Sequence, residues 1–229
     1  MEFTKLSNRL DLVASFVPAG ARLLDVGSDH AYLPIALLQE GKIEAAIAGE
    51  VVEGPYQSAL QNVADNGLED KIEVRLANGL AAFEPADGIS CITIAGMGGR
   101  LIADILAAGL EKLANVSRLV LQPNNREDEL RAWLVDHDFH IVDEAILEEN
   151  EKFYEIIVVE HGSQELTAKE LRFGPYLMRE QAPAFVQKWS KEVEKLAFAL
   201  EQVPVENQSA RASLEERIAH IKEVLHVSK

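Results

Sequence analysis

The stretch that decides the fold reads RLLDVGSDHAYLP and spans residues 22–34. Its apolar run, residues 23–26, predicts a buried strand. Gly27 ends that run, because a residue without Cβ lets the backbone turn sharply and lie close to a ligand. The apolar residues between 31 and 38 predict a helix with one buried side. A strand, a glycine turn and a helix in this order open a nucleotide-binding α/β domain.

Two carboxylates at this turn, Asp25 and Asp29, decide which ligand it fits. Gly27 stands without the three spaced glycines of a dinucleotide fingerprint, which disfavours a pyrophosphate cofactor such as NAD. Carboxylates repel a phosphate and attract a cation. S-adenosylmethionine carries a sulfonium and an ammonium and no phosphate, so we expect it here, against Asp25, Gly27, Ser28, Asp29 and His30. The alternative is that Ser28 and Asp29 only cap the helix that follows.

Length and composition bound the class of protein. The chain has 229 residues, 48% of them apolar, enough for one sizeable core and an appendage. The N-terminus lacks a signal-type sequence, and no apolar run approaches the length of a membrane span. The single cysteine, Cys91, leaves too few thiols for an internal disulfide or a structural zinc site. We therefore expect a cytoplasmic protein without a membrane segment or a metal.

The acidic charge is concentrated in the first part of the chain. Residues 1–160 hold 12 Lys and Arg against 28 Asp and Glu, whereas residues 161–229 hold 10 against 10. Nucleic-acid binding depends on neutralising phosphates, so a net charge of −16 is unfavourable for it. Any RNA partner must therefore be bound by local clusters of basic residues.

The pattern of strand and helix repeats along the chain. Further strands are predicted at residues 45–50, 72–76, 89–95, 119–122, 139–147 and 153–160. The first five strands of the chain alternate with helices, but no helix separates the last two, which predicts a mostly parallel seven-stranded sheet with a closing hairpin. This is the Rossmann-like topology of a class I methyltransferase.

Polar residues and glycines end the strands where such sheets bind ligands. Glu50 lies 23 residues beyond Gly27, at the end of the second strand, where an acid can accept hydrogen bonds from ribose hydroxyls. Three glycines in residues 96–99 favour close approach of a ligand over a simple turn. The cofactor contacts expected at these strand ends are Glu50, Val51, Asn78, Gly79, Ala95, Gly96 and Met97.

The fifth strand ends in another polar group, Asn124, whose amide can donate to and accept from a nucleobase edge. Its neighbour Asn125 is expected to cap the helix over residues 127–135.

The tail has a different pattern. Apolar residues spaced by three and four predict helices over 189–203 and 214–225, joined by a turn at 204–209. We expect an antiparallel coiled-coil hairpin, with a methyltransferase domain over residues 1–161 and a helical domain over residues 162–229. A further amphipathic helix is predicted over residues 4–17.

Taken together, the sequence resembles the bacterial tRNA adenine-22 N1-methyltransferases along nearly its whole length. The resemblance is carried by residues 6–10 (LSNRL), 25–34 (DVGSDHAYLP), 48–51 (AGEV), 78–80 (NGL), 94–99 (IAGMGG), 122–124 (QPN) and 171–175 (LRFGP). It implies S-adenosylmethionine-dependent methylation of N1 of an adenine in the D-arm region of tRNA. It also implies a C-terminal coiled-coil hairpin, in agreement with the tail pattern.

Adenine N1 already carries an in-plane lone pair, so alignment with the methyl group matters more than a strong base. The candidate catalytic residues are therefore groups that hold the base: Asp29 and Asn124 on the adenine amino group, with His30 orienting base or cofactor. The candidate RNA-binding residues are Lys5, Arg9, Arg100, Arg172, Arg179, Lys188, Lys191 and Lys195.

Three other functions stay open from the sequence. The acidic core also fits a methyltransferase for a small molecule or a protein. A non-catalytic nucleotide-sensing module with a partner-binding hairpin is a further alternative, and a nicotinamide oxidoreductase is disfavoured by the missing glycines. A monomer is compatible with the sequence, which does not fix the oligomeric state.

Overall fold

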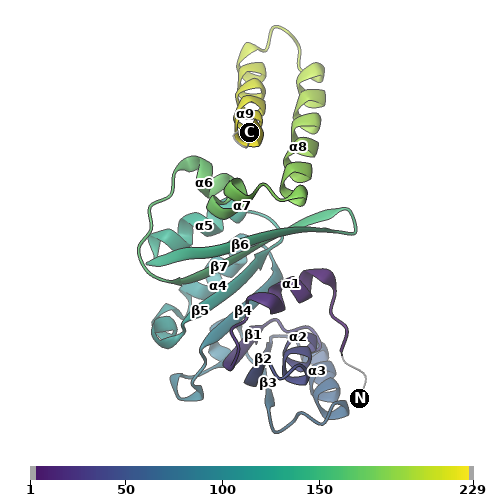
Figure 1. Cartoon of the computed structure of the whole chain (residues 1–229), viewed down its shortest axis with the longest axis vertical. Coiled ribbons are helices and arrows are strands. Elements are labelled where there is room, and N and C mark those ends of the chain that lie inside the picture. The colour runs from purple at the N-terminus through teal and green to yellow at the C-terminus, as the bar shows by residue number, and fades with distance from the viewer. Residues whose placement is uncertain (1–3, 227–229) are drawn as a thin grey trace.

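The computed structural model describes residues 4–226 and contains a seven-stranded sheet with the strand order β3-β2-β1-β4-β5-β7-β6 (Figure 1). The strands are β1 Ala21–Val26, β2 Ile43–Glu50, β3 Ile72–Leu76, β4 Cys91–Met97, β5 Arg118–Pro123, β6 Phe139–Glu149 and β7 Lys152–His161. Strands β1 to β5 pair in parallel, and β7 runs antiparallel to both of its neighbours. The predicted class I methyltransferase sheet is confirmed.

Alternation along the strands gives the sheet two apolar faces. On one face Leu24 and Val26 pack with α4 (Gly99–Ala107) and α5 (Glu127–Asp136). On the other face Leu23 packs with the first three helices of the chain. These are α1 Asn8–Phe16, α2 Tyr32–Gln39 and α3 Glu53–Asp65. Because both faces are covered, ligands reach the sheet at its strand ends.

The observed elements begin and end within a few residues of the predicted ones. Strand β3 has the predicted bounds, whereas β4 is displaced from residues 89–95 to Cys91–Met97. The first helix begins at Asn8 instead of residue 4, because Ser7 caps it by accepting a hydrogen bond from the Leu10 N–H at 3.2 Å. Two short helices, α6 Ala168–Phe173 and α7 Pro175–Glu180, have no counterpart in the prediction.

The two C-terminal helices, α8 Pro183–Gln202 and α9 Gln208–His226, are longer than predicted. They form a hairpin that projects from the β6–β7 end of the sheet (Figure 1). Trp189, Leu196 and Ile221 are buried in an apolar cluster of the hairpin, which also takes in Phe173 of α6 and Ile146 of β6. The base of the hairpin therefore shares its core with the sheet.

A buried group of charges, which we call the junction cluster, fastens the hairpin to the sheet. Arg131 of α5 pairs with Glu144 of β6 at 2.7 Å and with Glu155 of β7 at 2.5 Å. Lys188 of α8 pairs with Glu155 at 2.6 Å and with Glu127 at 3.1 Å. The segment between sheet and hairpin joins this cluster through its backbone, since Leu171 accepts from Arg131 and the Tyr176 N–H donates to Glu144.

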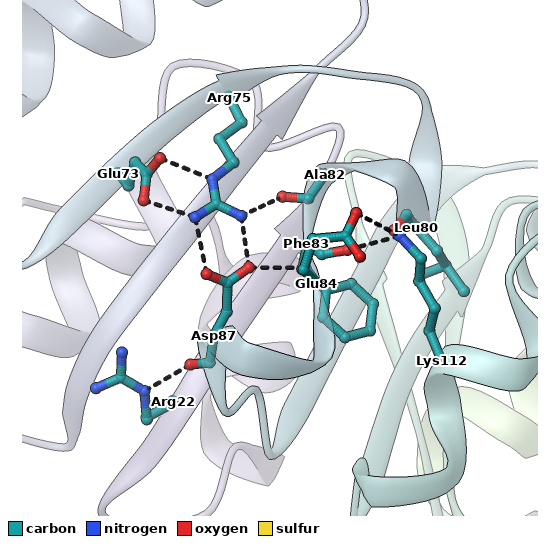
Figure 2. A network of polar contacts seen from close by, with 9 residues as sticks. All are labelled: Arg22, Glu73, Arg75, Leu80, Ala82, Phe83, Glu84, Asp87 and Lys112. Atoms are coloured by element: carbon teal, nitrogen blue, oxygen red, sulfur yellow. Dashed lines mark hydrogen bonds and ion pairs between the residues drawn. The ribbon is translucent and has the colours of Figure 1, made fainter.

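A second network, shown in Figure 2, fixes the loop that follows β3. Arg75 donates to both carboxylate oxygens of Asp87, at 2.6 and 3.0 Å, and to the carbonyl of Ala82. Lys112 donates to the carbonyls of Leu80 and Phe83 and pairs with Glu84 (Figure 2). Because this loop begins at Asn78 and Gly79, the network holds one of the predicted cofactor segments in place.

Among residues 4–226, no helix is long and apolar enough to span a bilayer, and no group of three or more His, Cys, Asp or Glu could hold a metal ion. Cys91 is fully buried in β4, and burial raises the pKa of its thiol to about 12. A thiol that stays protonated is unreactive, as expected for a core cysteine.

Candidate active site

The carboxylate of Asp25 is fixed at the end of β1 by two hydroxyl groups. Ser28 Oγ and Thr93 Oγ1 each donate to it at 2.6 Å. Burial raises the pKa of Asp25, while these hydrogen bonds and the charge of Arg9 act in the opposite direction. Thr93 was not among the predicted site residues, although it is a polar residue in an otherwise apolar strand. It faces Asp25 because the register pairs these two positions of β4 and β1.

The turn after Asp25 holds an unusual backbone. Gly27 has a φ of +67°, and Asp29, His30 and Ala31 follow with φ values of +42°, +67° and +58°. The left-handed region costs a non-glycine residue about 1–2 kcal/mol, and such backbone strain concentrates at functional sites. A Cβ at Gly27 would collide with Met97 Cε. The absence of a Cβ at Gly27 thus leaves room for the end of the Met97 side chain, which a larger residue would displace.

The capping role considered for Ser28 and Asp29 is wrong. Helix α2 begins at Tyr32, its N-cap residue is Ala31, and no side chain caps it. Ser28 instead donates to Asp25, and the side chain of Asp29 is 82% exposed. Neither polar side chain caps the helix, and both belong to the turn. This favours the interpretation of the turn as a binding site.

Glu50 ends β2 directly beside this turn. Its side chain accepts a hydrogen bond from the backbone N–H of Asp29 at 2.5 Å through one carboxylate oxygen. The residue is only 5% exposed, and burial is the main cause that raises its pKa. The second oxygen can accept from a ligand hydroxyl. Val51, the next residue, exposes 61% of its surface and offers an apolar contact at the same place.

The ends of β3 and β4 complete this edge. Asn78 and Gly79 line a cavity of about 360 Å³ together with Leu101 and Ile105 of α4. Ala95, Gly96 and Met97 lie at the end of β4, beside the turn after β1. The structure thus brings every predicted cofactor residue to the carboxyl ends of four neighbouring strands, β3, β2, β1 and β4, which we call the cofactor edge.

Gln122 connects the ends of β4 and β5 and was missed by the sequence analysis. It is fully buried, and its Oε1 accepts from Arg9 Nη1 at 2.6 Å and from the Gly96 N–H at 3.0 Å. Its Nε2 donates to the carbonyl of Pro123 and to Asn124 Oδ1. The feature of the sequence that could have indicated this role is the amide side chain of Gln122 near the end of an otherwise apolar strand. The role of Gln122 depends on its partner Arg9, which lies 113 positions earlier in the chain and is brought beside it by the packing of α1.

Asn124 follows directly after β5 and contacts both Gln122 and the end of β4. Its amide nitrogen donates to the carbonyl of Gly96 at 2.7 Å, and its oxygen accepts from Gln122 at 3.1 Å. The predicted cap by Asn125 is wrong, because the N-cap of α5 is Arg126 at a φ of +55° and no side chain caps that helix. The amide of Asn124 is held in one orientation and still has a free N–H and lone pair for a ligand.

Asp29 and His30, the other predicted catalytic residues, are open to solvent. Their side chains lie 3.5 Å apart, and that of His30 is 40% exposed. The imidazole stacks on Tyr32 with the ring centres 5.4 Å apart. Carboxylate and ring are thus placed where a substrate could reach them.

A larger cavity of about 910 Å³, which we call the hairpin cavity, separates this edge from the hairpin. Asn124 lines it, together with four of the predicted RNA-binding residues: Arg172, Lys188, Lys191 and Lys195. Lys5, Arg9, Arg100 and Arg179 do not line it. Lys152, Tyr154, Trp189 and Arg217 also line it and were not predicted.

The cations of the hairpin cavity differ in how far they are already neutralised. Lys188 is bound to two carboxylates. Lys191 pairs with Glu148 at 3.3 Å, and Lys195 and Arg217 share Glu192 at 3.7 and 3.6 Å. Arg172 lies over the rings of Phe173 and Trp189, and no carboxylate of residues 4–226 forms an ion pair with it. Burial and the nearby charge of Arg217 lower its pKa.

Comparison with known proteins gives consistent matches. The sequence model of the tRNA (adenine(22)-N(1))-methyltransferase family matches residues 23–223. The Bacillus subtilis tRNA (adenine(22)-N(1))-methyltransferase is 39% identical over 98% of this chain and 99% of its own length. Streptococcus pneumoniae Sp1610 in complex with S-adenosyl-L-methionine is 66% identical, with a TM-score of 0.90 over 97% of this chain and all of that one. M. capricolum TrmK in complex with S-adenosyl-homocysteine is 29% identical, with a TM-score of 0.84 over 98% and 99% of the two chains.

Proposed function

Because the chain belongs to the tRNA (adenine(22)-N(1))-methyltransferase family, we propose that it transfers a methyl group from S-adenosylmethionine to N1 of adenine 22 in bacterial tRNA. The observation that carries this proposal is the meeting of the cofactor residues at one sheet edge, next to Asn124 and a basic cavity. Family membership favours tRNA over the small-molecule, protein and nucleotide-sensing alternatives.

The residues at the sheet edge fit the cofactor. A sulfonium and an ammonium suit an edge that carries the carboxylates of Asp25, Asp29 and Glu50. The free oxygen of Glu50 is placed for ribose hydroxyls, and the apolar recess beside Asn78 and Gly79 suits the adenine ring. Ser28, His30, Val51, Ala95, Gly96 and Met97 supply the remaining backbone and apolar contacts that we propose.

The bound cofactor supplies a methyl group on a positively charged sulfur. The N1 lone pair of the adenine forms the new bond to carbon, while the electron pair of the carbon–sulfur bond returns to sulfur. Positive charge thereby moves from sulfur to the base. N1 lies on the Watson–Crick edge, so the base must be unpaired or extruded before it can react.

We assign the exposed carboxylate of Asp29 to the adenine amino group, where it stabilises the charge that develops on the base. The fixed amide of Asn124 presents a second hydrogen-bonding group to the same edge. His30, stacked on Tyr32, orients the base beside them. These residues position the reacting atoms, which is the larger part of catalysis for a nucleophile that needs no activation.

The hairpin cavity is the proposed path of the RNA. It is lined by six Lys and Arg side chains against three Asp and Glu, in a chain with a net charge of −16. Arg172, which forms no ion pair with a carboxylate of residues 4–226, and Arg217 are the two guanidinium groups that line the cavity and the strongest candidates for phosphate contacts. Lys191 and Lys195 add exposed charge along α8, and Lys5, Arg100 and Arg179 lie on the surface outside the cavity. Lys188 is committed to Glu127 and Glu155, so we assign it to the junction cluster.

One chain supplies both the edge and the cavity, so we propose that a monomer suffices for activity. Because the proposed substrate is tRNA, we propose that the activity is cytoplasmic.

Incubation of the protein with S-adenosylmethionine and tRNA transcripts tests the proposal, with 1-methyladenosine measured by nucleoside mass spectrometry. We expect methylation of transcripts with adenine at position 22 and none when guanine replaces it. Methylation that survives the replacement, or transfer only to protein or small molecules, would refute the assignment.

A further inference from the structure

Arg9 was predicted to bind RNA, but its guanidinium lies at the cofactor edge of the sheet. It reaches there from α1 and donates to Gln122 at 2.6 Å. A Cβ built on Gly96 would lie 3.5 Å from Arg9 Nη1 and 4.0 Å from Nη2. The guanidinium therefore faces the bare Cα at the end of β4, beside the turn that carries Asp25 and Gly27.

The charge of Arg9 is exceptional in this place. Asp25, Asp29 and Glu50 make the edge acidic, and Arg9 is the cation whose charge acts on Asp25. The acids suit the sulfonium and ammonium of S-adenosylmethionine, but they repel its third charged group, the α-carboxylate. A cation at the same edge would offset that repulsion.

Arg9 also has the hydrogen-bonding capacity that a carboxylate needs. A guanidinium has five N–H donors in a planar fork that matches a carboxylate. Among residues 4–226, Gln122 accepts from Nη1, and no acceptor is bound to Nε or Nη2. The guanidinium lies 5.6 Å from the ring centre of Tyr154, and its bond to the buried Gln122 fixes its orientation. A fixed, partly exposed fork with free donors is preorganised for an anion.

We propose that Arg9 binds the α-carboxylate of S-adenosylmethionine and of the product S-adenosylhomocysteine. This inference rests on the proposed methyltransferase function, because it takes that cofactor as the ligand. It gives Arg9 a direct contact with the cofactor in place of an RNA phosphate. The competing role is purely structural, in which Arg9 only orients Gln122 and the Gly96 loop.

Calorimetry with two ligands separates these roles. One ligand is S-adenosylhomocysteine, and the other is its decarboxylated analogue, which keeps the adenosine, the sulfur and the amine. A charge-assisted contact predicts that the wild-type chain binds S-adenosylhomocysteine about tenfold or more tightly than the analogue. Arg9→Met should remove this preference by weakening S-adenosylhomocysteine alone, and Arg9→Lys should restore part of it.

Arg126→Met is the matched control, since Arg126 is an exposed arginine at the adjacent β5–α5 turn and pairs with Glu129. It should leave both affinities unchanged. If Arg9→Met weakens the binding of both ligands equally, Arg9 has a structural role. If the wild-type chain binds both ligands with the same affinity, the proposal is overturned, whether or not the variants fold. Failure of the wild-type chain to bind either ligand would instead refute the methyltransferase function itself, and the role of Arg9 with it.

Discussion

The cofactor edge and the junction cluster both bury carboxylates, but they neutralise them differently. At the edge, Asp25 receives hydroxyl hydrogen bonds and Glu50 receives a backbone N–H, and burial raises the pKa of both. At the junction, Glu155 is buried as deeply, yet the charges of Arg131 and Lys188 hold its pKa below the usual value, whereas burial still raises the pKa of Glu144 beside Arg131.

We infer from this difference that the cofactor edge binds a ligand, whereas the junction cluster stabilises the fold. Carboxylates held by neutral donors keep their negative charge available for a cationic ligand. Carboxylates already matched by Arg131 and Lys188 have no charge left to offer, but the loss of one partner would leave the others buried and unpaired. Changes at the junction should therefore affect stability first, and changes at the edge should affect ligand affinity first.

The largest effect is expected from truncation at the two possible ends of the core. A chain ending after residue 161 loses the backbone contacts of Leu171 and Tyr176 to the junction cluster, and it uncovers Ile146. We expect that chain to lose cooperative thermal unfolding, although the strand pattern is complete there. A chain ending after residue 181 keeps α6 and α7 and should still unfold cooperatively. Equal melting of the two chains would mean that residues 162–181 contribute nothing to the core.

Arg131→Met comes next, because it leaves Glu144 and Glu155 buried without their main partner. Breaking a buried ion pair costs about 3–5 kcal/mol, which urea unfolding can measure. Adding Glu144→Gln and Glu155→Gln should recover part of the loss. The control Arg126→Met breaks an exposed pair and should change the free energy of unfolding by less than about 1 kcal/mol. A loss of that small size in Arg131→Met would contradict a structural role for the cluster.

At the cofactor edge, Glu50→Ala should weaken S-adenosylmethionine binding by about ten- to hundredfold, the effect of one charge-assisted hydrogen bond. The free energy of unfolding should change little or rise, because a buried carboxylate with a raised pKa is removed. Calorimetry and urea unfolding measure the two quantities. Glu53→Ala, in the first turn of α3, is the exposed control. Unchanged cofactor affinity in Glu50→Ala would exclude Glu50 from the site.

The smallest effect concerns Asp87 and depends on pH. Hydrogen bonds from Arg75 lower the pKa of Asp87 from 3.8 to about 2. A depressed pKa stabilises the fold above pH 3.8, and this contribution is lost as the pH falls toward 2. Asp87→Asn should therefore cost about 2 kcal/mol at pH 7, with a difference from wild type that shrinks below pH 4. Asp70→Asn serves as the exposed control, and a difference independent of pH would contradict the assignment.

The sequence predicted the fold well because its signals are local. Alternation in residues 72–76 was enough to place β3, and the glycine turn at Gly27 was enough to place the end of β1, where we propose that the cofactor binds. The predicted cofactor residues share that edge because parallel strands end together.

The parts that could not be predicted depend on contacts across the chain. Thr93 and Gln122 carry no motif, and their roles follow from strand register and from the docking of α1. Lys188 looks like any solvated lysine of a helix until Glu127 and Glu155 are placed beside it. Spacing along a helix shows which side chains share a face, but not which partner faces them.

The most direct test of the proposed separation between a cofactor site at the sheet edge and an RNA path through the hairpin cavity is the steady-state kinetics of the double variant Arg172→Gln/Arg217→Gln. We predict that KM for tRNA rises at least about tenfold. The slope of log binding constant against log salt concentration should decrease by about two, about one for each phosphate contact that is lost. The affinity for S-adenosylhomocysteine should equal that of wild type, and Lys222→Gln, an exposed control on α9, should match wild type in both. An unchanged KM for tRNA, or a parallel loss of cofactor affinity, would contradict the account.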